Sequence, residues 1–227
     1  MISDPSGVLH KLLAERHSCR AFRPEQVSRD VLESVLRTAQ RTASWCNSQA
    51  WQVAITSGPA TERLRDKLVA AQQSGATRGS DFPFPEEYAG VYLDRRRESG
   101  FQLYNAVGVE RGDKRGYAKQ ALENFRLFGA PHVAILSSPP GLGVYGAVDV
   151  GGYVQILLLA MQAHGIATIP QAALARHSAL LKAELGIEPD RLVVCGISFG
   201  YEDTAHPANS YRTNRADLSD VISWIDV

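Results

Sequence analysis

The chain has 227 residues, of which 44% are hydrophobic and 21% are charged. These fractions are close to those of average soluble globular proteins, which excludes collagen-like, coiled-coil and disordered classes. Lysine and arginine together number 24, as do aspartate and glutamate, so no overall basic field exists to recruit nucleic acid or an anionic membrane.

The first half of the chain is predicted to be mainly helical. Val8–Arg16 places its leucines on one face, and Ser28 is a suitable N-cap for a helix that runs to Ala43. Trp51–Thr56 alternates and is rich in β-branched residues, which predicts a strand. Further helices are expected over Thr61–Gln73, Glu86–Glu110 and Asp113–Phe128, with a loop rich in glycine, serine and proline over Gly75–Pro85.

The second half alternates strands with helices. We expect strands over Pro131–Ser137, Ile166–Ile169 and Arg191–Phe199. Helices are expected over Gly146–His164 and Ser178–Leu185, each followed by a glycine that can end it. Helices first, then strands separated by helices, predict an α+β sandwich around one sheet. Because no strand is followed by GxGxxG, a dinucleotide-binding Rossmann unit is not expected.

The number of cysteines and the lengths of apolar runs indicate in which cellular compartment the protein is expected. The three cysteines, Cys19, Cys46 and Cys195, form no CxxC pair, so we expect neither a redox dithiol nor a zinc site. Without a disulfide framework, we expect a reducing, cytoplasmic location. The N-terminus lacks the basic and apolar regions of a signal peptide. The longest apolar run, Ile156–Met161, is far shorter than the ~20 residues that cross a bilayer, so no membrane partner is expected.

A basic cluster, Arg16-His17-Ser18-Cys19-Arg20, lies at the end of the first predicted helix. Two arginines beside a hydroxyl and an imidazole can hold a phosphate or a polyol through charge-assisted hydrogen bonds. The alternative is a solvated helix end, where Arg and His face the C-terminal helix dipole. The local sequence alone favours this alternative.

A second candidate segment, Ala43–Trp51, precedes the first predicted strand. It contains Ser44, Asn47 and Gln49 between two tryptophans. Amide side chains can read donors and acceptors on a heterocycle edge, and indoles stack on flat rings. An ordinary helix-to-strand turn is an equally good interpretation of the segment in isolation.

Two later segments complete the set of candidates. Small residues in Thr168–Ala173 would let a planar ligand approach the backbone, provided that no buried helix begins there; a proline-initiated loop is the alternative. The tail Asn209–Arg215 offers two more cations, Arg212 and Arg215, to an anionic ligand.

Together these segments resemble the FMN-dependent nitroreductase family. The family's opening pattern is matched by Arg16, His17, Ser18, Arg20 and Phe22, and its second pattern by Ser44, Asn47, Gln49 and Trp51. Two prolines of that second pattern are replaced, by Ala43 and Ala50. The C-terminal pattern is matched by Gly200, Tyr201, Asn209 and Arg215, so the resemblance covers most of the chain in the family's order.

The resemblance implies a three-layer α+β sandwich with a central, mostly antiparallel sheet flanked by helices. It also implies a homodimer that exchanges C-terminal tails and binds FMN at the subunit interface. Arg16, Ser18 and Arg215 would hold the phosphate and ribityl chain, and Arg20 would lie near the N1/C2=O edge of the flavin. The implied cofactor-binding residues are Arg16, His17, Ser18, Arg20, Ala43, Ser44, Trp45, Asn47, Pro170, Gln171, Ala172 and Arg215.

Within this pattern, Ser44, Trp45 and Asn47 would come from the other subunit, and backbone N–H groups around Gln171 and Ala172 would face N5 and O4. The single domain, 1–227, would carry a variable helical lid at about 75–128. Its aromatic and basic side chains would meet the acceptor or the NADPH 2′-phosphate, unless they form an amphipathic helix with a solvated arginine face. The lid candidates are Tyr92, Arg96, Phe101 and Tyr104.

The implied activity is FMN-dependent reduction of nitroaromatics, quinones or related electrophiles by NADPH or NADH, through a ping-pong hydride mechanism. No side chain is required as an acid or base, and Arg20 is the electrostatic candidate. Alternatives on the same fold are a reductive dehalogenase, a flavin-consuming enzyme and a flavin-binding regulatory protein. A helical interaction module is a further alternative from a different class.

Overall fold

The computed structural model describes residues 4–75 and 79–226. Its helices are α1 (Pro5–Glu15), α2 (Arg29–Ala39), α3 (Pro59–Gln73), α4 (Gly90–Ala106), α5 (Lys114–Glu123), α6 (Gly143–Ala163) and α7 (Ser178–Leu185). Its strands are β1 (Gln52–Ser57), β2 (His132–Ser138), β3 (Ala167–Gln171) and β4 (Leu192–Gly200). Every predicted helix and strand of the sequence therefore has a counterpart within the described residues. Residues 76–78 of the predicted Gly75–Pro85 loop lie outside them.

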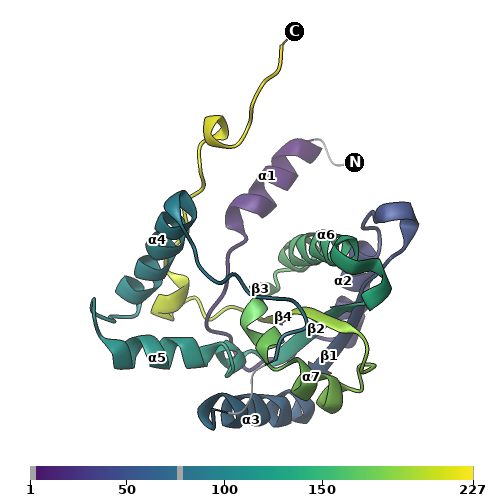
Figure 1. Cartoon of the computed structure of the whole chain (residues 1–227). Coiled ribbons are helices and arrows are strands. Elements are labelled where there is room, and N and C mark those ends of the chain that lie inside the picture. Colours follow the sequence, from purple (N-terminus) through teal and green to yellow (C-terminus); the bar gives the residue numbers. More distant parts are fainter. Residues whose placement is uncertain (1–3, 76–78, 227) are drawn as a thin grey trace.

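The four strands form one sheet in the order β1-β2-β4-β3, and all neighbouring pairs are antiparallel. Strand β2 is buried along its whole length because it lies inside the sheet with helices on both faces. Helices α2 and α6 cover one face, and α3 and α7 cover the other (Figure 1). The predicted three-layer α+β sandwich with an antiparallel sheet is confirmed.

Helix α6 forms most of the core on its side of the sheet. Its inward positions include Val150, Tyr153, Leu157 and Met161, all buried against α2, β2 and β4. A side chain at Gly146 would meet the Ser138 hydroxyl at 2.3 Å, so glycine allows α6 to start close to β2. Pro140–Ala163 is the one helical stretch among the described residues that is long and apolar enough to span a bilayer, and half of its most apolar window is buried inside the protein.

Several helix ends differ from the predicted ends. Helix α1 begins at Pro5 instead of Val8 because the Asp4 carboxylate accepts a hydrogen bond from the Gly7 amide at 2.9 Å. Helix α2 is capped by Ser28 as predicted, but it ends at Ala39 instead of Ala43. There the Thr42 hydroxyl donates to the Ala39 carbonyl at 2.7 Å, which satisfies a carbonyl at the helix end.

Helices α4 and α5 form an arm beside the sandwich (Figure 1). Both are shorter than the predicted Glu86–Glu110 and Asp113–Phe128. Helix α5 is capped by Asp113, but the chain leaves it after Glu123 and then adopts a left-handed backbone at Leu127 and Phe128, both of which are buried. Burial of these two side chains thus overrides helical periodicity at this end.

Candidate functional site

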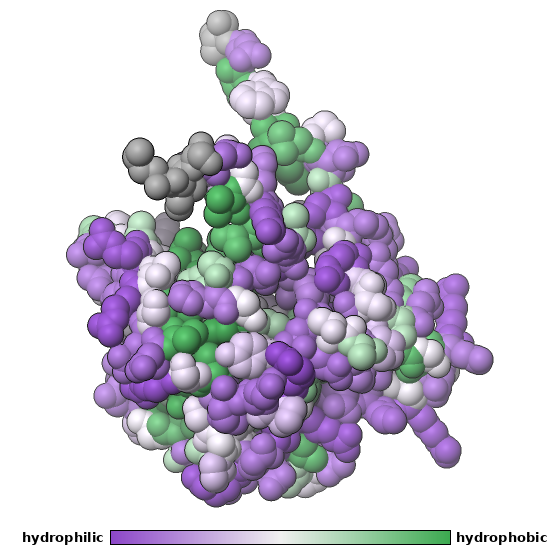
Figure 2. Space-filling model, turned by 180° about the vertical axis from the view of Figure 1, so that it is seen from behind, coloured by the Kyte–Doolittle hydropathy of each residue, from purple (hydrophilic) through white to green (hydrophobic). Residues whose placement is uncertain are grey.

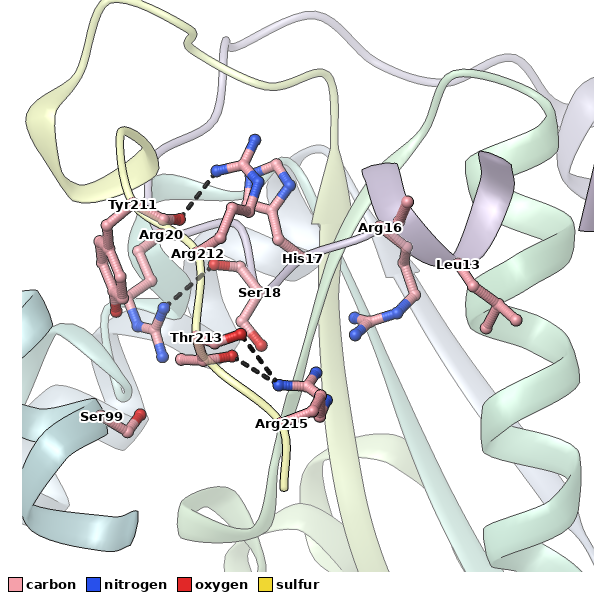
Figure 3. A pocket seen from close by; sticks show the side chains of 11 residues that line it. Leu13, Arg16, His17, Ser18, Arg20, Ser99, Tyr211, Arg212, Thr213 and Arg215 are labelled. Atoms are coloured by element: carbon pink, nitrogen blue, oxygen red, sulfur yellow. Dashed lines mark hydrogen bonds between the residues drawn. The ribbon is translucent and has the colours of Figure 1, made fainter. Parts of the chain in front are cut away.

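A cavity of about 350 Å³ lies between the end of α1, helix α4 and the C-terminal tail (Figure 3). It brings together the N-terminal basic cluster and the tail, which are almost two hundred residues apart in the sequence. The residues around it are Leu13, Ala14, Arg16, His17, Ser18, Arg20, Ser99, Tyr211, Arg212, Thr213 and Arg215. We refer to it as the basic pocket.

The N-terminal side of the basic pocket is an extended segment rather than a solvated helix end. Helix α1 ends at Glu15, and the chain then runs beside β3, where the Cys19 amide donates to the Thr168 carbonyl at 3.0 Å. Successive side chains of an extended segment point to opposite sides. Cys19 is fully buried, whereas Ser18 and Arg20 line the cavity. Burial raises the pKa of the Cys19 thiol to about 12, so this thiol is protonated and no nucleophile.

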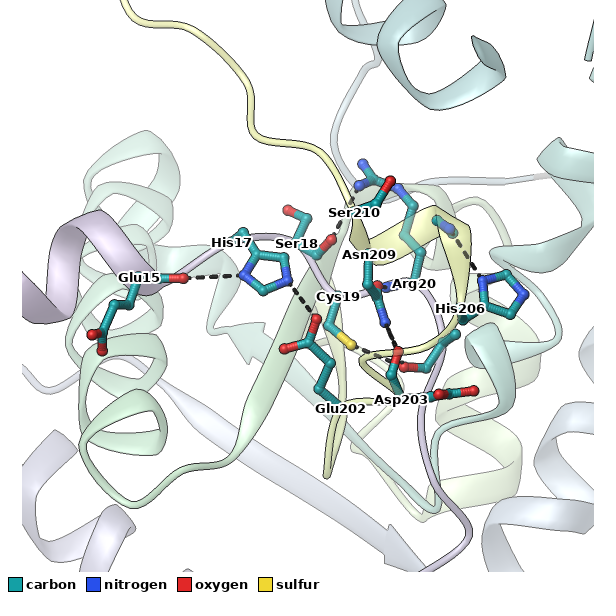
Figure 4. Close-up of polar contacts among 12 residues, drawn as sticks. Glu15, His17, Ser18, Cys19, Arg20, Glu202, Asp203, His206, Asn209 and Ser210 are labelled. Atoms are coloured by element: carbon teal, nitrogen blue, oxygen red, sulfur yellow. Dashed lines mark hydrogen bonds and ion pairs between the residues drawn. The ribbon is translucent and has the colours of Figure 1, made fainter. Parts of the chain in front are cut away.

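Asn209 fastens the tail to this segment (Figure 4). Its buried side-chain oxygen accepts from the Arg20 amide at 2.7 Å, and its side-chain nitrogen donates to the carbonyls of Ala21 and Asp203 at 2.9 Å. Asn209 thus bonds to backbone groups of the N-terminal segment, at Arg20 and Ala21, and of the C-terminal tail, at Asp203. These bonds fix how the two segments are aligned on either side of the pocket. The spacing from Asn209 to Arg215 then places the second pair of arginines at the cavity.

The basic pocket concentrates positive charge without a carboxylate on its wall. Among the described residues, its four arginines form no ion pair. Burial, with the nearby charge of Arg215, lowers the pKa of Arg16. Burial also lowers the pKa of Arg20, whose guanidinium donates to the Ser18 carbonyl at 3.1 Å. Uncompensated cations around a cavity favour an anionic ligand.

Hydroxyl groups accompany the cations. The Tyr211 hydroxyl oxygen is buried and has no hydrogen-bond partner among the described residues, and the Ser18 and Thr213 side chains line the same cavity. A buried polar atom without a partner is uncommon in native structures and calls for an absent ligand or water. The pocket therefore offers both charge and hydroxyl contacts.

His17 lines the pocket but is held by the protein. Its Nδ1 lies 3.1 Å from the Glu15 carbonyl, and its Nε2 lies 3.0 Å from a Glu202 carboxylate oxygen. Both ring nitrogens are thus engaged with the protein, which assigns His17 to shaping the pocket wall.

The predicted loop residues Ala43, Ser44, Trp45 and Asn47 do not line the basic pocket. They lie between α2 and β1, beside α6, where the Trp45 ring packs edge-on against Tyr145 with ring centroids 4.6 Å apart. Trp45 remains 61% exposed. One chain alone therefore does not bring this loop to the arginines.

Segment 170–172 ends β3 and begins a short 3₁₀ turn, Ala172–Arg176. The Gln171 side chain is buried: it donates to the Asn124 carbonyl at 2.8 Å and accepts from the Ser198 hydroxyl at 2.5 Å. Pro170 is half-buried and Ala172 is exposed. The segment thus presents backbone and small side chains, and not the Gln171 amide, to a ligand.

Comparison with known proteins decides the family. The model of the nitroreductase family matches residues 13–201, which span the basic cluster, the 43–51 segment and the whole sheet. This chain belongs to the nitroreductase family. Arg215 and the rest of the tail lie beyond the matched residues, so the structure adds the C-terminal half of the basic pocket.

Individual relatives agree with this membership. Nitroreductase NfnB of Mycolicibacterium smegmatis is 39% identical over 218 residues, which cover 96% of this chain and 92% of the relative. A 4-nitrobenzoate reductase of Pseudomonas putida is 29% identical and covers 90% of this chain. The crystal structure of FMN-dependent NfnB from Mycobacterium smegmatis in complex with NADPH superposes with a TM-score of 0.94, covering 98% of this chain and 100% of that one.

The four lid candidates of this nitroreductase differ in their surroundings: two contact neighbouring side chains, one is exposed to solvent and one lines a cavity. Tyr104 packs against Tyr117 with the rings tilted by 35° and their centroids 4.5 Å apart, which joins α4 to α5. Phe101 lies beneath the Arg111 guanidinium, and Tyr92 is 68% exposed. Arg96 lines a cavity of about 730 Å³ that also includes Ala173, next to the predicted flavin-facing segment.

Six pocket residues are absent from the predicted site residues of this nitroreductase: Leu13, Ala14, Ser99, Tyr211, Arg212 and Thr213. Leu13 and Ala14 belong to the last turn of α1. Tyr211, Arg212 and Thr213 lie within the tail segment that was noted for its cations, and their proximity to Arg215 was the available signal. Ser99 comes from α4, where no local pattern marks it. In the described chain, no group of three or more His, Cys, Asp or Glu side chains is placed to hold a metal ion.

Proposed function

We propose that this chain is an FMN-dependent oxidoreductase that takes electrons from NAD(P)H and reduces nitroaromatic, quinone or related electrophilic acceptors. The main support is the basic pocket, where four arginines surround one cavity and no carboxylate lines it. The relatives add the chemistry, since the NfnB structure is that of an FMN-dependent enzyme in complex with NADPH.

The pocket residues fit the phosphate end of FMN. Arg16 and Arg215 face each other across the cavity (Figure 3), and the pKa of Arg16 is lowered partly by that proximity. A phosphate dianion between two such groups would relieve their repulsion and form charge-assisted hydrogen bonds with both. The hydroxyls of Ser18, Thr213 and Tyr211 suit a polyol chain.

Bound FMN would supply the hydride chemistry, accepting electrons from NAD(P)H and passing them to the acceptor in turn. The protein's part is to bind, orient and tune. Arg20 is half-buried, and its guanidinium donates to the Ser18 carbonyl at 3.1 Å and lies over the Tyr211 ring, so its cation is held in place. A preorganised cation of this kind stabilises negative charge that develops nearby. No side chain of the pocket is needed as an obligatory acid or base.

We propose further that the active form is a homodimer with exchanged C-terminal tails. Beyond Arg215 the tail leaves the body of the protein with its apolar side chains uncovered (Figures 1 and 2). Leu218, Val221 and Ile225 are 60–82% exposed, and Trp224 is 78% exposed. Val144, Tyr145 and Val148 on α6 are also mostly exposed. Apolar surfaces of this kind support association with a second copy, which would bring the Ser44–Asn47 loop to the pocket.

The remaining assignments follow the same proposal. The chain would be a single nitroreductase-like domain, 1–227, whose region 75–128 forms the lid, with Arg96 placed to meet an anionic group of donor or acceptor. All three cysteines are free, which is compatible with a reducing, cytoplasmic location.

Steady-state kinetics test the proposed function. Initial rates of NADPH or NADH oxidation should be measured over a grid of donor and acceptor concentrations, with nitrobenzoate and a quinone as acceptors. Because donor and acceptor would use the same FMN in turn, we expect parallel double-reciprocal lines. Intersecting lines would contradict alternation at one site, and no oxidation with any acceptor would contradict the function.

A further inference from the structure

The loop between α2 and β1 has an unusual backbone. Three of its non-glycine residues, Cys46, Asn47 and Gln49, have φ values of 50°, 55° and 49°. The left-handed region is disfavoured for residues with a Cβ atom, and asparagine tolerates it best. Such conformations persist only where surrounding structure holds them, and they gather at functional sites. We call this segment, residues 44–50, the left-handed loop.

One carboxylate on α6 holds the left-handed loop. Asp149 is 8% exposed, and its two oxygens lie 3.1 and 3.3 Å from the Trp45 amide nitrogen. The Ser48 hydroxyl also donates to Asp149, at 3.0 Å. A single side chain thereby fixes two points of the loop three residues apart, on either side of Cys46 and Asn47.

Asp149 has no cationic partner among the described residues. A buried carboxylate without a cation is costly unless hydrogen bonds satisfy it. Asp149 is the only charged residue of α6, and a hydrophobic side chain would serve the core better at this position. The hydrogen bonds to the loop are therefore the reason that we see for an aspartate at position 149.

The rest of the left-handed loop is held by a side chain of its own and by Gln40 at the end of α2. The Ser44 hydroxyl accepts from the Gln49 amide at 2.9 Å, and Gln40 donates to the Gln49 side-chain oxygen at 2.9 Å. The family pattern has prolines where this chain has Ala43 and Ala50, so proline rings do not stiffen the segment here. In this chain, hydrogen bonds to side chains restrict the loop backbone instead.

We propose that Asp149 is a positioning residue for cofactor binding: it keeps Ser44, Trp45 and Asn47 in the arrangement that contacts the flavin. This inference rests on the proposed function, because these side chains meet FMN only if the protein binds it with the loop of a second subunit. Asp149 itself acts through the loop amide and hydroxyl, and not on the flavin.

The test uses the full chain with Asp149→Ala, Asp149→Asn and Ser48→Ala. Asp66→Asn is the matched control. Asp66 is an exposed aspartate of α3, on the other side of the sheet, and its side chain forms no hydrogen bond within the described part of the chain. Two quantities are measured: the exchange rates of the Trp45 and Gln49 amide hydrogens in FMN-free protein, and the FMN dissociation constant from flavin fluorescence quenching.

We expect Asp149→Ala to accelerate both amide exchange rates and to weaken FMN binding by about tenfold or more, because several hydrogen bonds are lost together. Asparagine retains an acceptor for the Trp45 amide, so Asp149→Asn should recover most of both quantities. Ser48→Ala removes one neutral hydrogen bond and should change them by about threefold. Asp66→Asn should match the wild type.

Three outcomes would overturn the proposal. Wild-type amide exchange in both Asp149→Ala and Ser48→Ala would show that the carboxylate does not hold the loop. Faster exchange with unchanged FMN affinity would show that the loop does not position flavin contacts. If the wild type binds no FMN, the proposed function fails first, and the role of Asp149 toward a flavin fails with it. Should Asp149→Ala not fold, Asp149→Asn and Ser48→Ala decide the outcome.

Discussion

The basic pocket and the left-handed loop satisfy their polar groups in opposite ways. In the pocket, four arginines lack carboxylate partners and the buried Tyr211 hydroxyl lacks any partner among the described residues. In the loop, the Asp149 carboxylate, the Ser44 hydroxyl and the Gln49 side chain are all engaged within the protein. Cations without a counter-charge and a hydroxyl without a partner are available to an anionic or polyol ligand, whereas groups paired within the protein maintain a shape.

This contrast suggests that the two regions contribute differently to FMN binding. The pocket would supply most of the affinity, because charge-assisted hydrogen bonds are the strong ones. The loop would supply orientation, because its backbone is fixed before any ligand arrives, which lowers the entropy lost on binding. The two regions lie apart in one chain, so in the proposed dimer the loop of one subunit would meet the pocket of the other.

The largest expected effect comes from removing two pocket cations together. Arg16→Ala combined with Arg215→Ala should weaken FMN binding on the order of a thousandfold, since each hydrogen bond to a charged group is worth about 1.5–3 kcal/mol. The melting temperature of the FMN-free protein should not fall, because the change removes mutual repulsion. Fluorescence titration and thermal unfolding measure the two quantities. Arg63→Ala, an exposed helical arginine on α3, is the control; equal losses in both variants would contradict a specific site.

Separating the subunits should have the next largest effect. Deleting residues 218–227 removes the exposed apolar end of the tail but leaves Arg215 in place. We expect sedimentation velocity to show a shift from dimer to monomer. FMN affinity should fall by about 10- to 100-fold, because the loop of the partner no longer reaches the pocket. A full-length monomer that binds FMN tightly would contradict the division of work between two subunits.

Arg20 is expected to affect rate more than affinity. With FMN bound at saturation, Arg20→Ala should slow flavin reduction by NADPH at least about tenfold and lower the flavin reduction potential. Arg20→Lys, which retains the charge, should preserve most of the potential. Stopped-flow absorbance and redox titration provide the values. An unchanged potential and rate in Arg20→Ala would show that this cation only helps to build the pocket.

The smallest expected effect is on the pH dependence of folding stability. It arises from His132 on β2, outside both the basic pocket and the left-handed loop. His132 Nε2 accepts from the Val27 amide at 2.9 Å, so the ring is neutral, and burial lowers the pKa of His132 below its ordinary value of 6.5. The unfolded chain therefore takes up the proton more readily than the folded one. The stability that this site contributes is present above pH 6.5 and is lost as the pH falls below it.

Urea unfolding from about pH 8 to about pH 5 checks this dependence. His132→Leu should flatten the decline in stability toward low pH, whatever its effect on stability at neutral pH. His10→Ala, at an exposed position on α1, should leave the decline unchanged. A decline of wild-type steepness in His132→Leu would assign the effect to other groups.

Much of the fold and about half of the site could be predicted from the sequence. Strands β2 and β4 were predictable because each contains an apolar stretch rich in β-branched residues. The end of α7 at Leu185 was predictable because Gly186, which follows it, adopts the left-handed conformation with φ of 64°. Helix ends were less predictable: α2 stops at Ala39 because Thr42 satisfies its carbonyl, which no periodicity encodes. Three of the four pocket arginines, Arg16, Arg20 and Arg215, were predictable because family spacing, not local pattern, singled them out.

The missing half of the site depends on tertiary contacts. Ser99 reaches the pocket because α4 passes it, and sequence separation hides that proximity. Asp149 carries a signal in the sequence: it is the lone charged residue within the strongly apolar helix α6. Aspartate is rarely buried without a partner. An aspartate in such a helix therefore predicts specific hydrogen-bond donors nearby, which here are the Trp45 amide and the Ser48 hydroxyl of the left-handed loop.

Anaerobic reduction of the purified, FMN-loaded protein tests the central claim most directly. NADPH or NADH is added while the visible absorbance of oxidised flavin is recorded, and a nitroaromatic is then added to the reduced protein. We expect the absorbance to be lost on adding the nucleotide and to return on adding the acceptor. A flavin that stays oxidised with both nucleotides would contradict the assignment of this chain as an NAD(P)H-dependent flavoenzyme.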